Sequence, residues 1–95
     1  MLIVTVVYNL KGELQEEFMK EIIEKGIQSS TQSEEGNSLY EFMIPWGVKD
    51  KVFLLEYWKD ESVLKYHQTL DHYFVLQDIK AKYVERTDIS KFIVN

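Results

Sequence analysis

The stretch Lys51–Phe74, KVFLLEYWKDESVLKYHQTLDHYF, contains the features that decide the fold and the candidate site. It begins as a strand with apolar side chains on both faces, and Glu56 is the one acidic residue within that strand. Asp60 is a favoured N-cap residue, so the chain is predicted to turn there into a short helix. His67 and His72 follow, five residues apart. We therefore expect this stretch to form one wall of a reactive pocket.

The segments on either side complete the pattern of a split βαβ, ferredoxin-like domain. Runs of β-branched and aromatic residues predict strands, and apolar residues that recur every three or four positions predict helices. The expected order is β-α-β-β-α-β, an α+β fold with an antiparallel sheet, in a single domain that covers residues 1–95. The predicted elements are strands at 2–8, 37–46, 51–58 and 86–94, and helices at 12–30, 60–67 and 69–83.

The composition argues against several classes of function. A net charge of −5 and a single arginine, Arg86, do not suit a nucleic-acid surface, which needs clustered Lys and Arg. The chain has no cysteine, which removes disulfides and thiolate nucleophiles and fits a reducing cytoplasm. The apolar run at the start ends at Tyr8, far short of the ~20 residues that a membrane span needs. We expect a cytoplasmic protein without a nucleic-acid or membrane partner.

The two faces of the predicted sheet predict a homodimer. Two helices can cover only one face of a four-stranded sheet, and in a monomer the other face should be polar. The strands at 2–8 and 51–58 are instead apolar on both faces. Because soluble monomers rarely expose a large apolar patch, we expect two copies to pack sheet against sheet.

Three titratable residues are candidates for catalysis, and each has two interpretations. His67 and His72 either form hydrogen bonds at helix ends or act as a general base near neutral pH. Glu56 is either an ion-pair partner of a lysine or Arg86, or a buried carboxyl that accepts a proton or orients a histidine. No metal site is predicted, because ligand histidines on one helix face need i,i+4 spacing and these are i,i+5.

Four further residues are candidates for substrate binding. Trp58, Tyr40 and Tyr66 could line an aromatic slot, although each would equally fit an ordinary core position. Asn9 ends the first strand, where it is either a turn residue or a group that orients a substrate oxygen. There is no glycine-rich phosphate loop or dinucleotide fingerprint, so we expect no flavin or nicotinamide cofactor.

Three short motifs together resemble the antibiotic biosynthesis monooxygenase family, whose fold is a dimeric α+β barrel. They are Glu35-Gly36-Asn37, Glu56-Tyr57-Trp58 and His67-Gln68-Thr69-Leu70-Asp71-His72. The resemblance covers essentially the whole chain in length and element order. It implies a small, cofactor-independent enzyme that oxidises a quinol or polyphenolic aromatic with dioxygen.

Under this resemblance, His67 or His72 would remove a proton from the substrate, Trp58 and Tyr40 would shape an apolar slot, and Asn9 or Glu56 would orient the substrate oxygen. The same family includes an isomerase of a phosphorylated signalling sugar, and that activity stays open as an alternative. A third possibility is a non-catalytic dimeric binding module, which a pocket filled by Phe42 or Tyr66 would favour.

Overall fold

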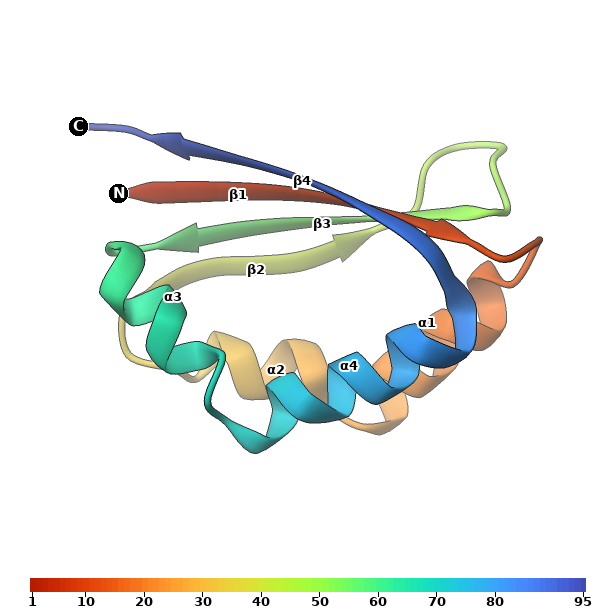
Figure 1. Ribbon diagram of the computed structural model, residues 1–95, viewed down its shortest axis with the longest axis horizontal. Coiled ribbons are helices and arrows are strands. Elements are labelled where there is room, and N and C mark those ends of the chain that lie inside the picture. Colours follow the sequence, from red (N-terminus) through yellow and green to blue (C-terminus); the bar gives the residue numbers. More distant parts are fainter.

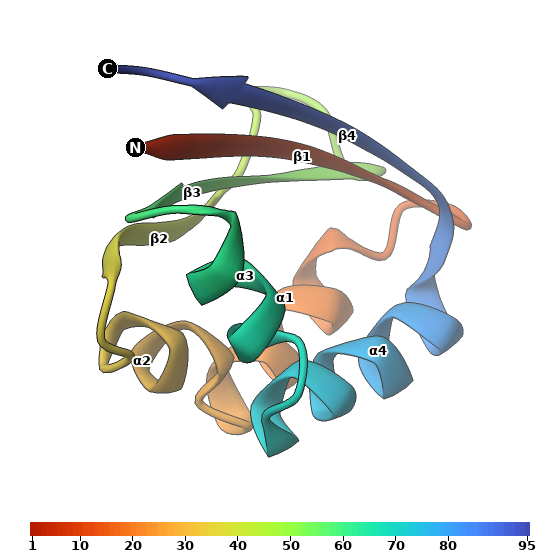
Figure 2. The same ribbon diagram turned by 60° about the vertical axis from the view of Figure 1, so that its left-hand side comes forward.

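The computed structural model describes residues 1–95. Its elements are β1 (Leu2–Leu10), α1 (Gln15–Glu24), α2 (Ile27–Gln32), β2 (Asn37–Met43), β3 (Lys51–Trp58), α3 (Glu61–His67), α4 (Asp71–Tyr83) and β4 (Val84–Ile93). The strands form one antiparallel sheet in the order β2-β3-β1-β4, and the helices lie together on one face of it (Figures 1 and 2). The predicted ferredoxin-like α+β order is therefore confirmed, except that the single helix predicted at 12–30 is divided into α1 and α2.

The core lies between the helix layer and the two central strands. Alternate residues of β1 and β3 point toward the helices and are buried, because side chains of a strand alternate between the faces of the sheet. Phe18 and Ile22 of α1 and Ile79 of α4 pack against them from the other side. At about 25 cal/mol per Å2 of apolar surface removed from water, this burial is the main stabilising contribution to the fold.

The predicted helix at 12–30 is wrong as a single element, because the chain breaks it at Gly26. This residue has a φ of 63°, in the left-handed region that a glycine adopts without steric cost. It ends α1 and begins α2 in a new direction. Apolar periodicity misses the break because Ile22 and Ile27, on either side of it, are both buried in the same core.

The predicted strand at 37–46 is too long, since β2 ends at Met43. Pro45 has no N–H to donate to a strand ladder, and Gly47 follows with a φ of 73°. Ile44 and Trp46 therefore lie in the loop rather than in the sheet, and Trp46 is fully exposed. At the other end of the chain, β4 begins at Val84, directly after α4.

The junction between α3 and α4 positions the candidate site. The carboxylate of Asp60 accepts a hydrogen bond from the Val63 N–H at 3.0 Å, so the predicted N-cap is confirmed. Helix α3 ends at His67, a short turn follows, and α4 begins at Asp71, two residues later than predicted. Because the chain changes direction in this turn, His72 points back toward His67.

The sheet face opposite the helices is mainly apolar, although it also carries Thr5, Glu41, Asp88 and Ser90, and it has no covering layer. We call this the open face; its residues are the half-buried or exposed apolar side chains Ile3, Val7, Leu39, Met43, Phe53, Leu55, Tyr57 and Phe92. The prediction that β1 and β3 are apolar on both sides agrees with this arrangement. The open face is the surface on which the dimer prediction depends.

Candidate active site

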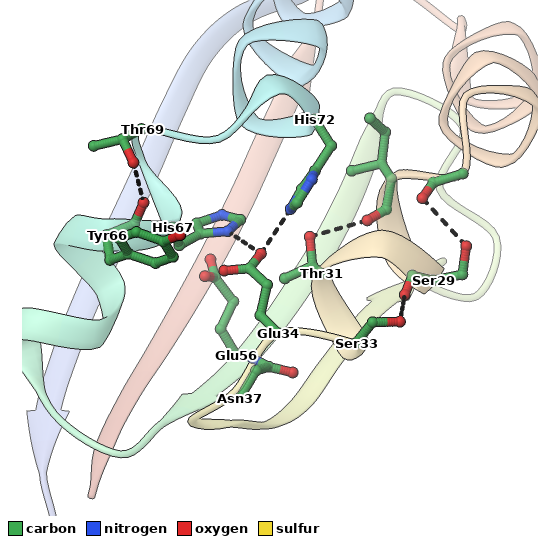
Figure 3. Close-up of polar contacts among 12 residues, drawn as sticks. Ser29, Thr31, Ser33, Glu34, Asn37, Glu56, Tyr66, His67, Thr69 and His72 are labelled. Atoms are coloured by element: carbon green, nitrogen blue, oxygen red, sulfur yellow. Dashed lines mark hydrogen bonds and ion pairs between the residues drawn. The ribbon is translucent and has the colours of Figure 1, made fainter.

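Three side chains from different parts of the chain meet at the end of the helix layer. Oε2 of Glu34 lies 2.6 Å from Nδ1 of His67 and 2.6 Å from Nε2 of His72 (Figure 3). Glu34 lies in the turn between α2 and β2, while the histidines come from the end of α3 and the start of α4. We call these three residues the Glu-His-His cluster.

The bridging carboxylate fixes how both rings are protonated. A carboxylate oxygen only accepts hydrogen bonds, so Nδ1 of His67 and Nε2 of His72 must each carry the hydrogen that they donate to Glu34. In a neutral His67 this leaves the lone pair on Nε2, which has no hydrogen-bond partner within the protein. The arrangement resembles a carboxylate that orients a histidine base.

The environment of His67 favours its neutral form. The ring is buried, with its centroid 4.7 Å from that of Trp58 and 5.4 Å from that of Tyr73. Burial lowers the pKa of His67 from its ordinary value, and the hydrogen bond and charge of Glu34 oppose this effect only in part. A neutral imidazole whose Nε2 is free is the form that accepts a proton.

His67 lines a cavity of about 140 Å3 between the helix layer and the sheet. The walls are mainly apolar and come from β1, α3, α4 and β4, with Tyr40 of β2 beside them. Nearly half of the lining residues are polar: Glu56, His67, Gln68, Gln77, Lys80, Thr87 and Lys91. An apolar enclosure with a few convergent polar groups is the usual form of a small-molecule site.

Glu56 is a buried carboxyl in this cavity. Its Oε1 accepts a hydrogen bond from the indole Nε1–H of Trp58 at 2.9 Å. Burial is the largest effect on it and raises its pKa to about 7, against the hydrogen bond from Trp58. The structure therefore gives Glu56 an indole partner rather than the ion pair with Arg86 that was one of the two interpretations of its sequence context.

The structure brings together five of the seven candidate residues. His67, Glu56 and Tyr40 line the cavity, His72 joins through Glu34, and Trp58 lies under the His67 ring with its indole on Glu56. Burial of Tyr40 raises its pKa well above the ordinary value, so its phenol stays neutral.

Asn9 and Tyr66 do not line this cavity. Asn9 lies at the far end of β1, where its side-chain amide donates to the Arg86 carbonyl and to Asp88 at 2.8 Å, and its oxygen accepts from Lys51. These contacts bind β1 to its two neighbouring strands. The Tyr66 side chain is 63% exposed, because it lies on the outer side of α3. The structure therefore places neither residue in this cavity, and Tyr66 instead lines a separate pocket together with Glu34.

Glu34 was missed in the sequence, where its neighbour Glu35 was chosen as the acidic residue of the Glu-Gly-Asn motif. Glu35 is exposed, whereas the Glu34 side chain is 9% exposed and its Oε1 has no hydrogen-bond partner. The adjacent acidic pair before Gly36 was a signal that one of the two carboxylates could turn inward. Sequence alone did not indicate which one.

The Glu-His-His cluster also holds the donor atoms that a metal ion would use, all within 4.8 Å of one another. The i,i+5 spacing does not separate the histidines as the sequence suggested, because the turn between α3 and α4 brings them together. Two ligand atoms on one tetrahedral zinc, however, lie about 3.3 Å apart. Both nitrogens are 2.6 Å from the same oxygen, so the cluster as it stands is hydrogen-bonded, and an ion would require both nitrogens to lose their hydrogens and the three groups to move apart.

The fold agrees with the comparison with known proteins. A family model described as "Antibiotic biosynthesis monooxygenase" matches residues 1–78. The chain belongs to the antibiotic biosynthesis monooxygenase family. It is similar to the Bacillus subtilis (strain 168) protein named "Putative monooxygenase YcnE", with 30% identity over 73 residues that cover 77% of this chain and 75% of the relative.

Solved structures share this fold. A conserved protein from Methanosarcina mazei Go1 has a TM-score of 0.85 and 25% identity, covering 99% of this chain and 92% of the other. A Nitrosomonas europaea protein that carries the same family name has a TM-score of 0.88 and 18% identity, covering 99% and 98%, a likeness of fold. Membership identifies the chain as a monooxygenase at the level of family and leaves the substrate undefined. No helix is both long and apolar enough to span a bilayer.

Proposed function

We propose that this antibiotic biosynthesis monooxygenase domain oxidises a quinol or polyphenolic aromatic with dioxygen and needs no organic cofactor. The observation that carries the proposal is the position of His67. Glu34 holds one ring nitrogen of this residue, and the ring lines an apolar cavity with its other nitrogen free. A small, partly apolar cavity with an oriented neutral base suits proton removal from a phenol.

His67 is the residue proposed to begin the reaction. Its Nε2 takes the proton of a substrate hydroxyl, and the Glu34 carboxylate stabilises the imidazolium that forms. The same carboxylate bonds His72, which holds Glu34 in place and spreads the charge. Glu56, bonded to Trp58, offers its second oxygen to orient the substrate hydroxyl.

The substrate itself supplies the electrons in this mechanism. The phenolate passes one electron to dioxygen, and the resulting radical pair combines to form a C–O bond. The O–O bond then breaks, so that one oxygen atom stays on the ring as a carbonyl and the other leaves as water. The substrate loses four electrons and two hydrogens, and no external reductant is needed. The apolar walls keep water away from these intermediates.

The test is oxygen uptake by the purified protein with hydroquinone, catechol and 1,4-dihydroxynaphthalene, each corrected for autoxidation in a protein-free blank. Labelled dioxygen should place one 18O atom in the product and one in water. We expect His67→Ala to lose at least about 100-fold in kcat, because general bases typically contribute about 100- to 10,000-fold. Circular dichroism would establish that the variant folds.

His72→Ala is the companion variant, since the sequence left open which histidine is the base. A smaller loss for His72→Ala than for His67→Ala would agree with His67 as the base and His72 as a support for Glu34. Unchanged oxidation by His67→Ala would remove His67 from the mechanism. No uptake by the wild-type protein with any quinol would overturn the proposal itself.

The second candidate function is isomerisation of a small polar metabolite. This alternative requires cationic groups in the pocket, and Lys80 and Lys91 both line the cavity. Isomerisation consumes no oxygen, so turnover under nitrogen would separate the two functions. A cavity plugged by Phe42 or Tyr66 would have favoured a binding module, and neither residue lines it.

We also propose that the functional unit is a homodimer that packs open face on open face. The open face carries apolar side chains from each of the four strands. Phe92 remains 54% exposed and Met43 40% exposed in the single chain. A second copy would remove this surface from water, as the resemblance to dimeric α+β barrels implies.

A further inference from the structure

Lys80 is a half-buried cation without an acidic partner. It projects from α4 into the wall of the cavity. Its Nζ lies 3.4 Å from Oε1 of Gln77 and 5.5 Å from the centroid of the Tyr8 ring, and none of the ion pairs in the structure includes it. Burial lowers the pKa of Lys80. A partly desolvated ammonium is costly unless an anion meets it, so an anionic ligand would offset that cost.

The other charged groups of the cavity supply that anion only in part. The charge of Glu56 raises the pKa of Lys80 against the larger effect of burial, but Glu56 forms no ion pair with Lys80, and its own pKa of about 7 leaves it protonated for a large part of the time near neutral pH. The Lys91 ammonium has its own partner, Glu61, at 3.3 Å. His67 is neutral on the cavity side. The cavity thus has an excess of positive charge inside a chain whose net charge is −5.

The size of the cavity limits the ligand to about one ring. Its volume is about 140 Å3. An apolar cavity of about 150 Å3 holds one benzene molecule. Aromatic walls from Tyr8, Tyr40 and Tyr73 suit the faces and edges of such a ring.

We propose that the cavity binds a single-ring substrate through an ionised oxygen that pairs with Nζ of Lys80. Lys80 would then determine specificity for substrates that are anionic or become so on binding. In the proposed reaction it would stabilise the phenolate that forms when His67 removes the proton. This inference depends on the proposed function only in taking the cavity as the substrate site.

Binding of 4-nitrophenol tests the inference without turnover, because its phenolate absorbs visible light and its phenol does not. Pairing with Lys80 should lower the pKa of the bound probe, so that its acid dissociation constant rises about tenfold over the free value. Lys80→Met keeps the length of the side chain and should remove this shift, while Lys80→Arg should retain much of it. Lys65→Met, which removes an exposed charge from α3, is the matched control and should behave as wild type.

Competition separates the possible sources of the anion and tests the size limit. In competition with the probe, benzoate should bind the wild-type protein about tenfold more tightly than it binds Lys80→Met. Benzamide, which is neutral, should bind the two proteins equally. Displacement by inorganic phosphate but not by benzoate would overturn the single-ring assignment. So would tighter binding of 4-nitro-1-naphthol than of 4-nitrophenol.

The two proposals fail in different ways. A probe shift that depends on Lys80, without oxygen uptake on any quinol, would leave the anion site standing and overturn the oxidation. Quinol oxidation that is unaffected by Lys80→Met, with an identical probe titration in both proteins, would overturn the anion site. Lys80→Gln is a second neutral variant and should give the same results as Lys80→Met. A difference between the two would reveal a folding defect specific to the methionine variant.

Discussion

Replacing Glu34 by glutamine tests how the carboxylate acts on His67. Glutamine can still accept hydrogen bonds but carries no charge to stabilise an imidazolium, so kcat should fall about 10- to 100-fold with little change in KM. Glu34 also raises the pKa of His67 against the larger effect of burial. Without that charge His67 stays unprotonated to lower pH, and the acid limb of the kcat/KM profile should move down.

The matched control is Glu35→Gln, which removes the adjacent exposed carboxylate. We expect its pH profile to match that of the wild type. An unchanged acid limb in Glu34→Gln, together with the same fall in kcat, would show that Glu34 acts only by holding the loop and not by its charge.

Glu56 should make the stability of the protein depend on pH. Its pKa is about 7 in the folded chain and about 4.5 in the unfolded chain, so between these values the folded state keeps a proton that the unfolded state has lost. Stability must therefore fall as pH rises through this window, by about 3 kcal/mol for a shift of this size. Below pH 4.5 this loss of stability is absent, and above pH 7 it is complete.

Glu56→Gln keeps an oxygen for the Trp58 indole and cannot ionise. Urea denaturation of both proteins at pH 4.5 and pH 8 isolates the contribution of Glu56, because all other titrating groups are shared. From pH 4.5 to pH 8, we expect the free energy of unfolding of the variant to rise by about 3 kcal/mol relative to that of the wild type. An equal pH dependence in the two proteins would contradict the buried, raised-pKa carboxyl.

At the scale of elements, Gly36 determines how closely the loop that carries Glu34 approaches α3. Its φ is 87°, and a Cβ at this position would lie 2.7 Å from Cγ1 of Val63. Gly36→Ala should therefore cost about 3 kcal/mol in the free energy of unfolding, from backbone strain and overpacking together. Gly47 has a similar φ of 73° but open space around it, so Gly47→Ala should cost only about 1 kcal/mol.

Chemical denaturation of these variants, with and without Val63→Ala, gives a double-mutant cycle. Removing the Val63 methyl groups should recover the overpacking part of the Gly36→Ala cost and leave the strain. If Gly36→Ala and Gly47→Ala cost the same, the close approach between the loop and α3 is not a constraint on the fold.

The elements that could be predicted from sequence are those whose signal is local. The alternation in β1 and β3 and the Asp60 cap depend on residues next to one another, and both were predicted correctly. The break at Gly26 was missed because the apolar positions remain buried on both sides of it. The spacing of apolar residues indicates which positions are buried. It does not indicate where a glycine adopts a left-handed backbone conformation.

The candidate site could be predicted only in part, because its central contact is not local. Glu34 and His67 are separated by 33 positions in the chain. The histidines were recognised from their side-chain chemistry, but which carboxylate meets them depends on how the turn before β2 packs against α3. Asn9 is the opposite case. It was predicted as a site residue because it ends the first strand, but it lies at the far end of the sheet from the Glu-His-His cluster.

At the scale of the whole molecule, the open face should control assembly. Leu55 lies on the central strand β3, paired with Thr5 of β1 and Glu41 of β2, so it is near the middle of this face. A charge placed there would be buried without a partner in a sheet-on-sheet dimer, at a cost of several kcal/mol in each subunit. Leu55→Glu should therefore convert the dimer to a monomer, as measured by light scattering after gel filtration.

The wild-type protein should scatter as twice the chain mass of 11.3 kDa, and Leu55→Glu as a single chain. Ile23→Glu is the matched control, because Ile23 is an apolar residue of the helix layer that is already 71% exposed, and its replacement should leave the dimer intact. A wild-type protein that scatters as one chain would mean that the open face stays exposed to solvent, and this would contradict the proposed dimer. The cavity lies on the opposite side of the sheet, so 4-nitrophenol binding should survive Leu55→Glu if each subunit carries a complete site.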